Sequence, residues 1–250
     1  MSNSLEEFSL DPSIFILEVV ATEKIVVINL DRRPDRWDAI RHARHPAVTE
    51  RFVRFAATDG QALPIALVES YRWNRKLPIE RAAGELGCRD SWFRAVAEHG
   101  PGLYFEDDAV PGAPWPFGEP PDSAEIVLPG GELWKRTREP GWTVAAPGAN
   151  GSHALWIRTD RAAAELCSVW QPDGRHQGPV DLAWGPVLQA RRAVVAVPQI
   201  VCQASPDTDV QFGRTFINGH SLIDPWCSLP GQPQPSGRRT FRPGRDERIP

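Results

Sequence analysis

The chain lacks most of the features that would assign a protein to a class at once. No apolar run is long enough to span a membrane. The N-terminal residues include Glu6 and Glu7 rather than the basic segment of a secretion signal. The net charge is −4, so no overall positive field attracts nucleic acid or an anionic membrane. These absences favour a cytoplasmic protein without a membrane span.

Cysteine and lysine are also scarce. The four cysteines are Cys88, Cys167, Cys202 and Cys227, and none of them lies within four residues of another. This spacing excludes the usual zinc-binding patterns and favours a reduced protein, with disulfide pairing as the alternative. Lysine supplies three of the 28 basic residues, which indicates a coding bias rather than a function.

Apolar, β-branched segments alternate with helix-like segments along most of the chain. The pattern predicts strands at residues 24–30, 51–57, 103–105, 124–128, 143–146, 153–158 and 193–197. It predicts helices at residues 34–44, 81–99, 159–170 and 180–191. This alternation is typical of an α/β sandwich with a mainly parallel central sheet.

The predicted organisation is one folded domain with two flanking segments. Residues 1–22 form an N-terminal extension, residues 23–229 the domain, and residues 230–250 a flexible tail rich in Arg and Pro. The tail is locally basic. It is therefore either a solvated segment or a contact for an anionic partner.

The most informative stretch is residues 103–109, a short apolar strand that ends in three consecutive carboxylates. Glu106, Asp107 and Asp108 repel one another, and a divalent cation would remove that repulsion. In α/β proteins, ligands bind beyond the carboxyl ends of the strands. The stretch therefore predicts a site for a metal and a diphosphate. The alternative is a solvated acidic turn before Pro111.

Several sequence blocks resemble glycosyltransferase family 25, which includes bacterial lipooligosaccharide galactosyltransferases and collagen galactosyltransferases. The resemblance is carried by residues 27–36 (VINLDRRPDR), 54–60 (RFAATDG), 84–91 (GELGCRDS), 105–108 (FEDD), 151–157 (GSHALWI), 180–181 (VD) and 198–207 (PQIVCQASPD). The blocks follow the order of the family. Together they are more specific than any one of them.

The resemblance implies a fold, a reaction and a set of partners. The fold would be a GT-A type, Rossmann-like sandwich. The reaction would move a sugar, with inversion, from a nucleotide-sugar donor such as a UDP-hexose, with Mn²⁺ or Mg²⁺ as cofactor. The acceptor could be a glycan, a protein or a modified nucleic acid. The chain departs from the family at Trp92, where the family has His, and at Pro206, which interrupts the last block.

The expected metal ligands are Asp108 first, Glu106 in support and His220 as a late ligand. If the strand continues through the carboxylates, Glu106 and Asp108 share one face and Asp107 points to the other. Asp107 would then contact the ribose or the groups around the metal.

The expected donor-binding residues come from the matching blocks: Asn29, Arg32, Asp59, Gly84, Glu85, Gly87, Ser91 and Asp107. Arg32 would bind phosphate through its guanidinium group, whereas Arg33 and Arg36 are expected to be solvated charges. Asp59 would contact the base or ribose, or instead form an Asx turn. The two glycines would let backbone approach the nucleotide, or else mark a helix start near Cys88.

The candidate base for the acceptor hydroxyl is Asp181, with a helix N-cap as its alternative role. His153 and His220 are further candidates for the base. Two other functions stay open. One is a catalytically silent protein that binds a nucleotide sugar or a glycan, and the other is a metal-dependent phosphohydrolase.

Overall fold

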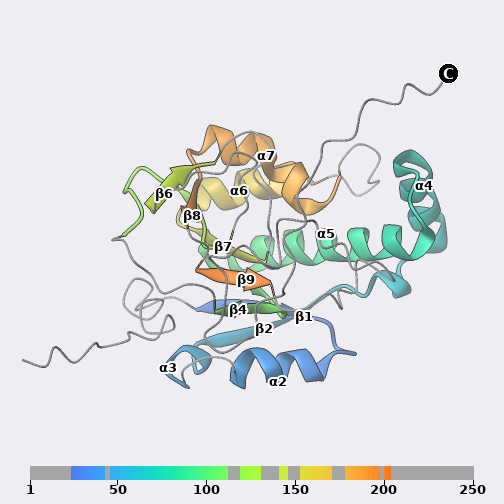
Figure 1. Cartoon of the computed structure of the whole chain (residues 1–250). Helices are drawn as coiled ribbons and strands as arrows, with labels where there is room; N and C mark the ends of the chain where they lie inside the picture. The colour runs from blue at the N-terminus through green and yellow to red at the C-terminus, as the bar shows by residue number, and fades with distance from the viewer. Residues whose placement is uncertain are drawn as a thin grey trace, which may run out of the picture.

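We describe a computed structural model, in which the described residues are 24–42, 46–111, 119–130, 141–145, 153–170, 178–197 and 200–203 (Figure 1). The predictions for residues 1–22, for residues 230–250 and for His220 lie outside these residues. Within them, no helix is long and apolar enough to cross a membrane.

A seven-stranded sheet has the order β2-β1-β3-β7-β5-β8-β6. Its strands are β1 (Ile25–Asn29), β2 (Phe52–Ala56), β3 (Gly102–Glu106), β5 (Ile126–Leu128), β6 (Gly141–Val144), β7 (Ala154–Ile157) and β8 (Val194–Val197). The pairs β1–β2, β1–β3 and β5–β8 are parallel, while β7 and β6 run antiparallel to their neighbours. The sheet is therefore mixed, with most strands in one direction. The prediction of an α/β fold is confirmed.

Helices cover both faces of the sheet (Figure 1). One face carries α2 (Pro34–His42) and α3 (Pro46–Thr49), and the other carries α5 (Ile79–His99), α6 (Asp160–Ser168) and α7 (Val180–Ala190). Helix α4 (Ile65–Arg75) follows a short 3-10 turn, η1 (Gly60–Ala62), and packs on α5. A second sheet pairs β4 (Ala109–Pro111) with β9 (Val201–Gln203).

Successive side chains of a strand point to opposite faces of the sheet, and both faces are covered at β1, so this strand is buried along its whole length. Val26 and Ile28 face the core under α5, α6 and α7. Ile25 and Val27 face the opposite core, which includes residues of α2 and α3. A strand covered on both faces needs mainly apolar side chains, and the first four residues of β1 are apolar; the fifth, Asn29, is polar.

Most predicted elements are present, with small shifts at their ends. Helix α6 begins after Thr159, whose hydroxyl accepts a hydrogen bond from the Ala162 N–H at 3.1 Å and so caps the helix. Helix α5 begins at Ile79 and runs through both of its glycines. The alternative start near Cys88 is therefore wrong. Helix α4 was not predicted.

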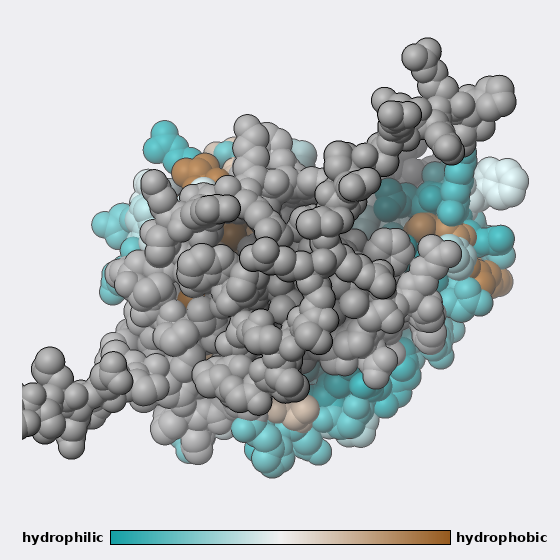
Figure 2. Space-filling view, in the orientation of Figure 1, coloured by the Kyte–Doolittle hydropathy of each residue, from teal (hydrophilic) through white to brown (hydrophobic). Residues whose placement is uncertain are grey.

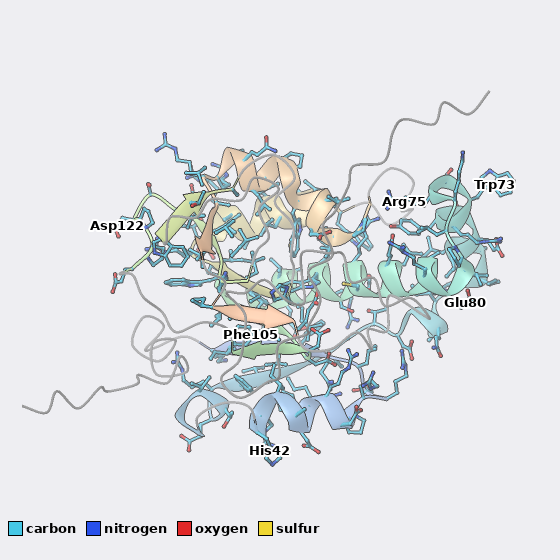
Figure 3. All side chains as sticks on the ribbon, in the orientation of Figure 1. His42, Trp73, Arg75, Glu80, Phe105 and Asp122 are labelled. Atoms are coloured by element: carbon cyan, nitrogen blue, oxygen red, sulfur yellow. The ribbon has the colours of Figure 1, made fainter. Side chains whose placement is uncertain are left out.

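Side-chain exposure separates the interior of the sheet from the outer side of α4. Phe105 is fully buried, whereas Trp73 is 83% exposed and projects from α4 (Figure 3). The visible surface at the lower edge of the molecule, near α2, is mainly hydrophilic (Figure 2). Helix α2 presents Asp35, Asp38 and Arg41 to solvent, in keeping with that surface.

Candidate functional site

The three carboxylates lie at a tight junction between the two sheets. Strand β3 ends at Glu106. The next two residues, Asp107 and Asp108, form a turn, and strand β4 begins at Ala109. The Asp107 N–H donates to the Ile28 carbonyl at 3.1 Å, at the carboxyl end of β1. Strand β3 therefore ends before Asp107 and Asp108, so the condition under which Glu106 and Asp108 were expected to share a strand face is not met.

Asp107 and Asp108 are each only 8% exposed, so the alternative of a solvated acidic turn is also wrong. Arg36 compensates part of their charge, because its Nη1 lies 3.2 Å from an oxygen of Asp107 and 4.0 Å from one of Asp108. The Arg36 side chain is 14% exposed. The expectation of a solvated Arg36 is therefore wrong, and this residue belongs to the site.

Asn29 holds Asp107 from the end of β1. Its Nδ2 donates to Asp107 Oδ2 at 2.7 Å and to the Arg33 carbonyl at 3.0 Å, while its Oδ1 accepts from Arg54 Nε at 2.8 Å. Asn29 is fully buried and uses both ends of its amide in these contacts. In this structure Asn29 positions Asp107, and its predicted contact with the donor stays a prediction.

Glu106 is held from helix α5. Trp92 Nε1 donates to Glu106 Oε1 at 2.7 Å, and the Cys88 thiol lies 3.8 Å from the same oxygen. Burial raises the pKa of Cys88 well above its usual value, and the charges of Glu106, Asp181 and Asp108 raise it further. A raised pKa disfavours the thiolate, so the surroundings of Cys88 do not suit a nucleophile.

Asp181 faces the same region from helix α7. Its charge acts on Cys88 and on His153, as the charge of Asp108 does. The N-cap of α7 is Pro179, so Asp181 lies inside the first turn and the N-cap alternative is wrong. Its Oδ1 accepts a hydrogen bond from the Leu182 N–H at 2.9 Å. The charges of Asp181 and Asp108 therefore act on the same thiol and the same imidazole.

His153 belongs to the core beside this turn. It is 7% exposed, and its Nε2 lies 3.2 Å from the Val201 carbonyl, which can only accept. Burial lowers the pKa of His153, while the charges of Asp108 and Asp181 partly offset that effect. This geometry favours a packing role for His153 over that of a base.

Arg32 and Asp59 form an ion pair between Arg32 Nε and Asp59 Oδ2 at 2.9 Å. Asp59 Oδ1 accepts a hydrogen bond from the Gln61 N–H at 3.0 Å, so the Asx-turn alternative is confirmed. Both side chains keep about a third of their surface exposed. Arg32 and Asp59 are therefore accessible to a ligand, as their predicted role in donor binding requires.

Gly87 and Ser91 hold the loop that follows β2 against α5. A Cβ at Gly87 would lie 2.7 Å from the Gly60 nitrogen, so the glycine lets two backbones meet. Ser91 Oγ accepts from the Thr58 N–H at 2.8 Å and donates to the Gly87 carbonyl at 2.6 Å. Gly84 lies beside the same contact. The glycines therefore accommodate protein backbone, and a nucleotide is not needed to explain them.

Glu85 lies in the interface between α4 and α5. It is 2% exposed and accepts hydrogen bonds from the Tyr71 hydroxyl at 2.8 Å and from Arg81 Nε at 3.0 Å. This buried network stabilises the packing of the two helices. These contacts give Glu85 a structural role, and its predicted contact with the donor stays a prediction.

The donor atoms at the turn suit a hard divalent cation. Carboxylate oxygens are the ligands that Mg²⁺ and Mn²⁺ prefer. The described residues contain no group of three or more His, Cys, Asp or Glu arranged to hold a metal. Mg²⁺, however, usually takes one or two carboxylates together with substrate phosphates. Asp108 and Glu106 fit that smaller requirement.

Comparisons with known proteins do not assign a family to this chain. No protein-family model matches it, and no curated protein matches it. The functional argument therefore rests on the motifs and on the geometry of the site.

Proposed function

We propose that the chain is a metal-dependent glycosyltransferase of the GT-A type. It would act in the cytoplasm and move a hexose, with inversion, from a nucleotide sugar to an acceptor hydroxyl. One observation carries the proposal: Glu106, Asp107 and Asp108 leave β3 beside the carboxyl end of β1, where α/β proteins bind ligands. The ordered resemblance to glycosyltransferase family 25 supports it.

Asp108 and Glu106 would hold Mn²⁺ or Mg²⁺ in this proposal. When bound, the cation neutralises charge on the departing nucleoside diphosphate. Asp107, Asn29 and Arg36 keep the acidic turn in place through the contacts described above. Among the described residues, the Arg36 guanidinium lies against Asp107 and Asp108, and hard divalent cations prefer carboxylate oxygens as ligands.

Asp181 would act as the base for the acceptor hydroxyl. An inverting transfer needs one group that takes the acceptor proton as the sugar moves. Asp181 is partly exposed and stands on a different element from the metal-binding turn. This separation suits a division between a donor side at β3 and an acceptor side at α7. The acceptor is a glycan, a protein or a modified nucleic acid.

A catalytically silent protein that binds nucleotide sugars is the second candidate. One specific observation favours it: the Arg36 guanidinium lies close enough to Asp107 and Asp108 to compensate part of their charge. Such a protein would bind the donor and show no turnover. A phosphohydrolase would cleave simple phosphoesters instead.

Release of nucleoside diphosphate from UDP-hexoses, with and without Mn²⁺, tests the proposal. We expect slow release without acceptor, and we expect Asp108→Asn to abolish it, because the substitution removes the metal-binding charge and keeps the shape. The melting temperature should change little. Wild-type rates in Asp108→Asn would contradict the metal assignment, and cleavage of a simple phosphoester would point to the hydrolase.

A further inference from the structure

Trp92 lies at the centre of the site, although the sequence marks it only as a departure from the family. It is fully buried on α5, and its indole N–H donates to Glu106 Oε1 at 2.7 Å. A hydrogen bond that a carboxylate accepts is shorter and stronger than one between two neutral groups. It therefore fixes the orientation of the Glu106 carboxylate.

The other side of the Trp92 ring reaches helix α7. The ring centroids of Trp92 and Trp184 are 5.2 Å apart with an interplanar angle of 86°, which is an edge-to-face contact. The ring centroid of Tyr104, on β3, lies 5.9 Å from that of Trp92. Trp184 stands three residues after Asp181, almost one helical turn, so the aromatic contact bears on the part of α7 that carries Asp181.

An indole and an imidazole differ as partners of a carboxylate. The Trp Nε1–H only donates and does not titrate, whereas a His ring can donate, accept or gain a proton. The donor of the hydrogen bond to Glu106 is therefore the same at every pH at which the protein is folded. The larger ring also fills the space between β3 and α7.

We propose that Trp92 is a positioning residue for Glu106 and α7. Its N–H fixes the carboxylate, and its ring, packed on Trp184, sets α7 and Asp181 relative to the acidic turn. The use of this arrangement in sugar transfer rests on the proposed function. The contact itself, between a buried indole and a carboxylate, does not.

Two substitutions separate the N–H from the ring. Trp92→Phe keeps an aromatic ring and removes the donor, while Trp92→His keeps a donor and removes volume. Trp184→Phe is the matched control: this neighbouring indole is 2% exposed, and its Nε1 has no hydrogen-bond partner in the described part of the chain. Each variant is measured for melting temperature and for the affinity of UDP in the presence of Mg²⁺.

We expect the affinity for UDP–Mg²⁺ to depend on the hydrogen-bond donor at position 92, and the melting temperature to depend on the size of the ring there. Trp92→Phe should weaken UDP–Mg²⁺ binding by about 10- to 100-fold, the usual range for partners that orient metal ligands. Its melting temperature should fall little. Trp92→His should bind more tightly than Trp92→Phe although it melts earlier, and Trp184→Phe should bind like wild type. Affinities that follow the melting temperatures would overturn the proposal.

A ligand-free measurement tests the contact separately. The Trp92 indole ¹H–¹⁵N resonance is identified by its loss in Trp92→Phe, and it should shift in Glu106→Gln and be protected from solvent exchange. An unchanged resonance in Glu106→Gln would overturn the proposal whatever the ligand. If the resonance shifts but the wild-type protein binds no UDP with Mg²⁺, the proposed function fails and the positioning contact stands.

Discussion

The Cys88 thiol reports on the charge of the site at the level of one residue. Its pKa is raised by burial and then by the carboxylates of Glu106, Asp181 and Asp108. The pKa of Cys167 is raised by burial alone. The two thiols therefore differ in their electrostatic surroundings, which makes Cys167 an internal control.

We predict that Glu106→Gln and Asp108→Asn each speed alkylation of Cys88 by iodoacetamide. Removing a negative charge lowers the thiol pKa, so the reactive thiolate forms at a lower pH. The rate of Cys167 should not change. Mass spectrometry of the digested protein measures both rates across pH 7–10. Equal acceleration at Cys167 would indicate general loosening and contradict the electrostatic account.

The sequence identifies the acidic residues of the site but not the residues that hold them. Glu106, Asp107 and Asp108 are adjacent, so the sequence shows their repulsion directly. Trp92 and Arg36 reach them from α5 and α2, and only the folded chain brings these elements together. A local pattern carries no information about such partners. This is why Arg36 was expected to be solvated.

At the scale of the element, α7 presents Asp181 in its first turn. The negative charge of Asp181 is stabilised there by the positive end of the helix dipole. A loss of the carboxylate should therefore lower stability slightly, whatever its chemical role. The chemical role must be read from binding and turnover.

We predict that Asp181→Ala lowers the transfer rate by about 10²–10⁴-fold, the usual cost of losing a general base. Donor and Mn²⁺ affinities should stay near those of the wild type, because the base acts on the acceptor proton. Asp160→Ala is the matched control, in the first turn of α6. Both variants should lose about 0.3–1 kcal/mol of stability. Unchanged turnover in Asp181→Ala would eliminate the base assignment.

The contact of α5 with the loop after β2 depends on Gly87. We predict that Gly87→Ala lowers the free energy of unfolding by about 1–3 kcal/mol, because the added Cβ would press on the backbone of Gly60. The control is Ala97→Gly, at an exposed position of the same helix, where glycine should cost about 1 kcal/mol. Urea unfolding measures both. A stabilising Gly87→Ala would contradict the close contact.

The sequence predicts the long buried elements best. The apolar run of β1 has no other explanation than burial on both faces, and the Thr159 cap fixes the start of α6. Helix α4 is harder to predict because only Val68 and Tyr71 of its side chains are buried and no side chain caps its start. The close contact at Gly87 is not visible in the sequence, because a glycine inside a helix is explained only by the backbone that packs against it.

At the scale of the whole molecule, the order of the strands in the sheet determines where the site forms. Strands β1 and β3 are parallel neighbours, so the end of the first strand meets the acidic end of the third. Helices α2, α5 and α7 approach from both faces and contribute Arg36, Trp92 and Asp181. The sequence predicts this edge through its α/β alternation. The mixed direction of the sheet follows from β6 and β7, which the alternation does not reveal.

The most direct test of the central claim is a thermal-shift panel of nucleotide sugars with and without Mn²⁺. A ligand that binds only the folded state stabilises it by about 2.7 kcal/mol at 100 times its dissociation constant. We predict that a UDP-hexose raises the melting temperature of the wild type when Mn²⁺ is present, and that Asp108→Asn shows no such shift. No shift with any nucleotide sugar, or an equal shift in Asp108→Asn, would contradict the account.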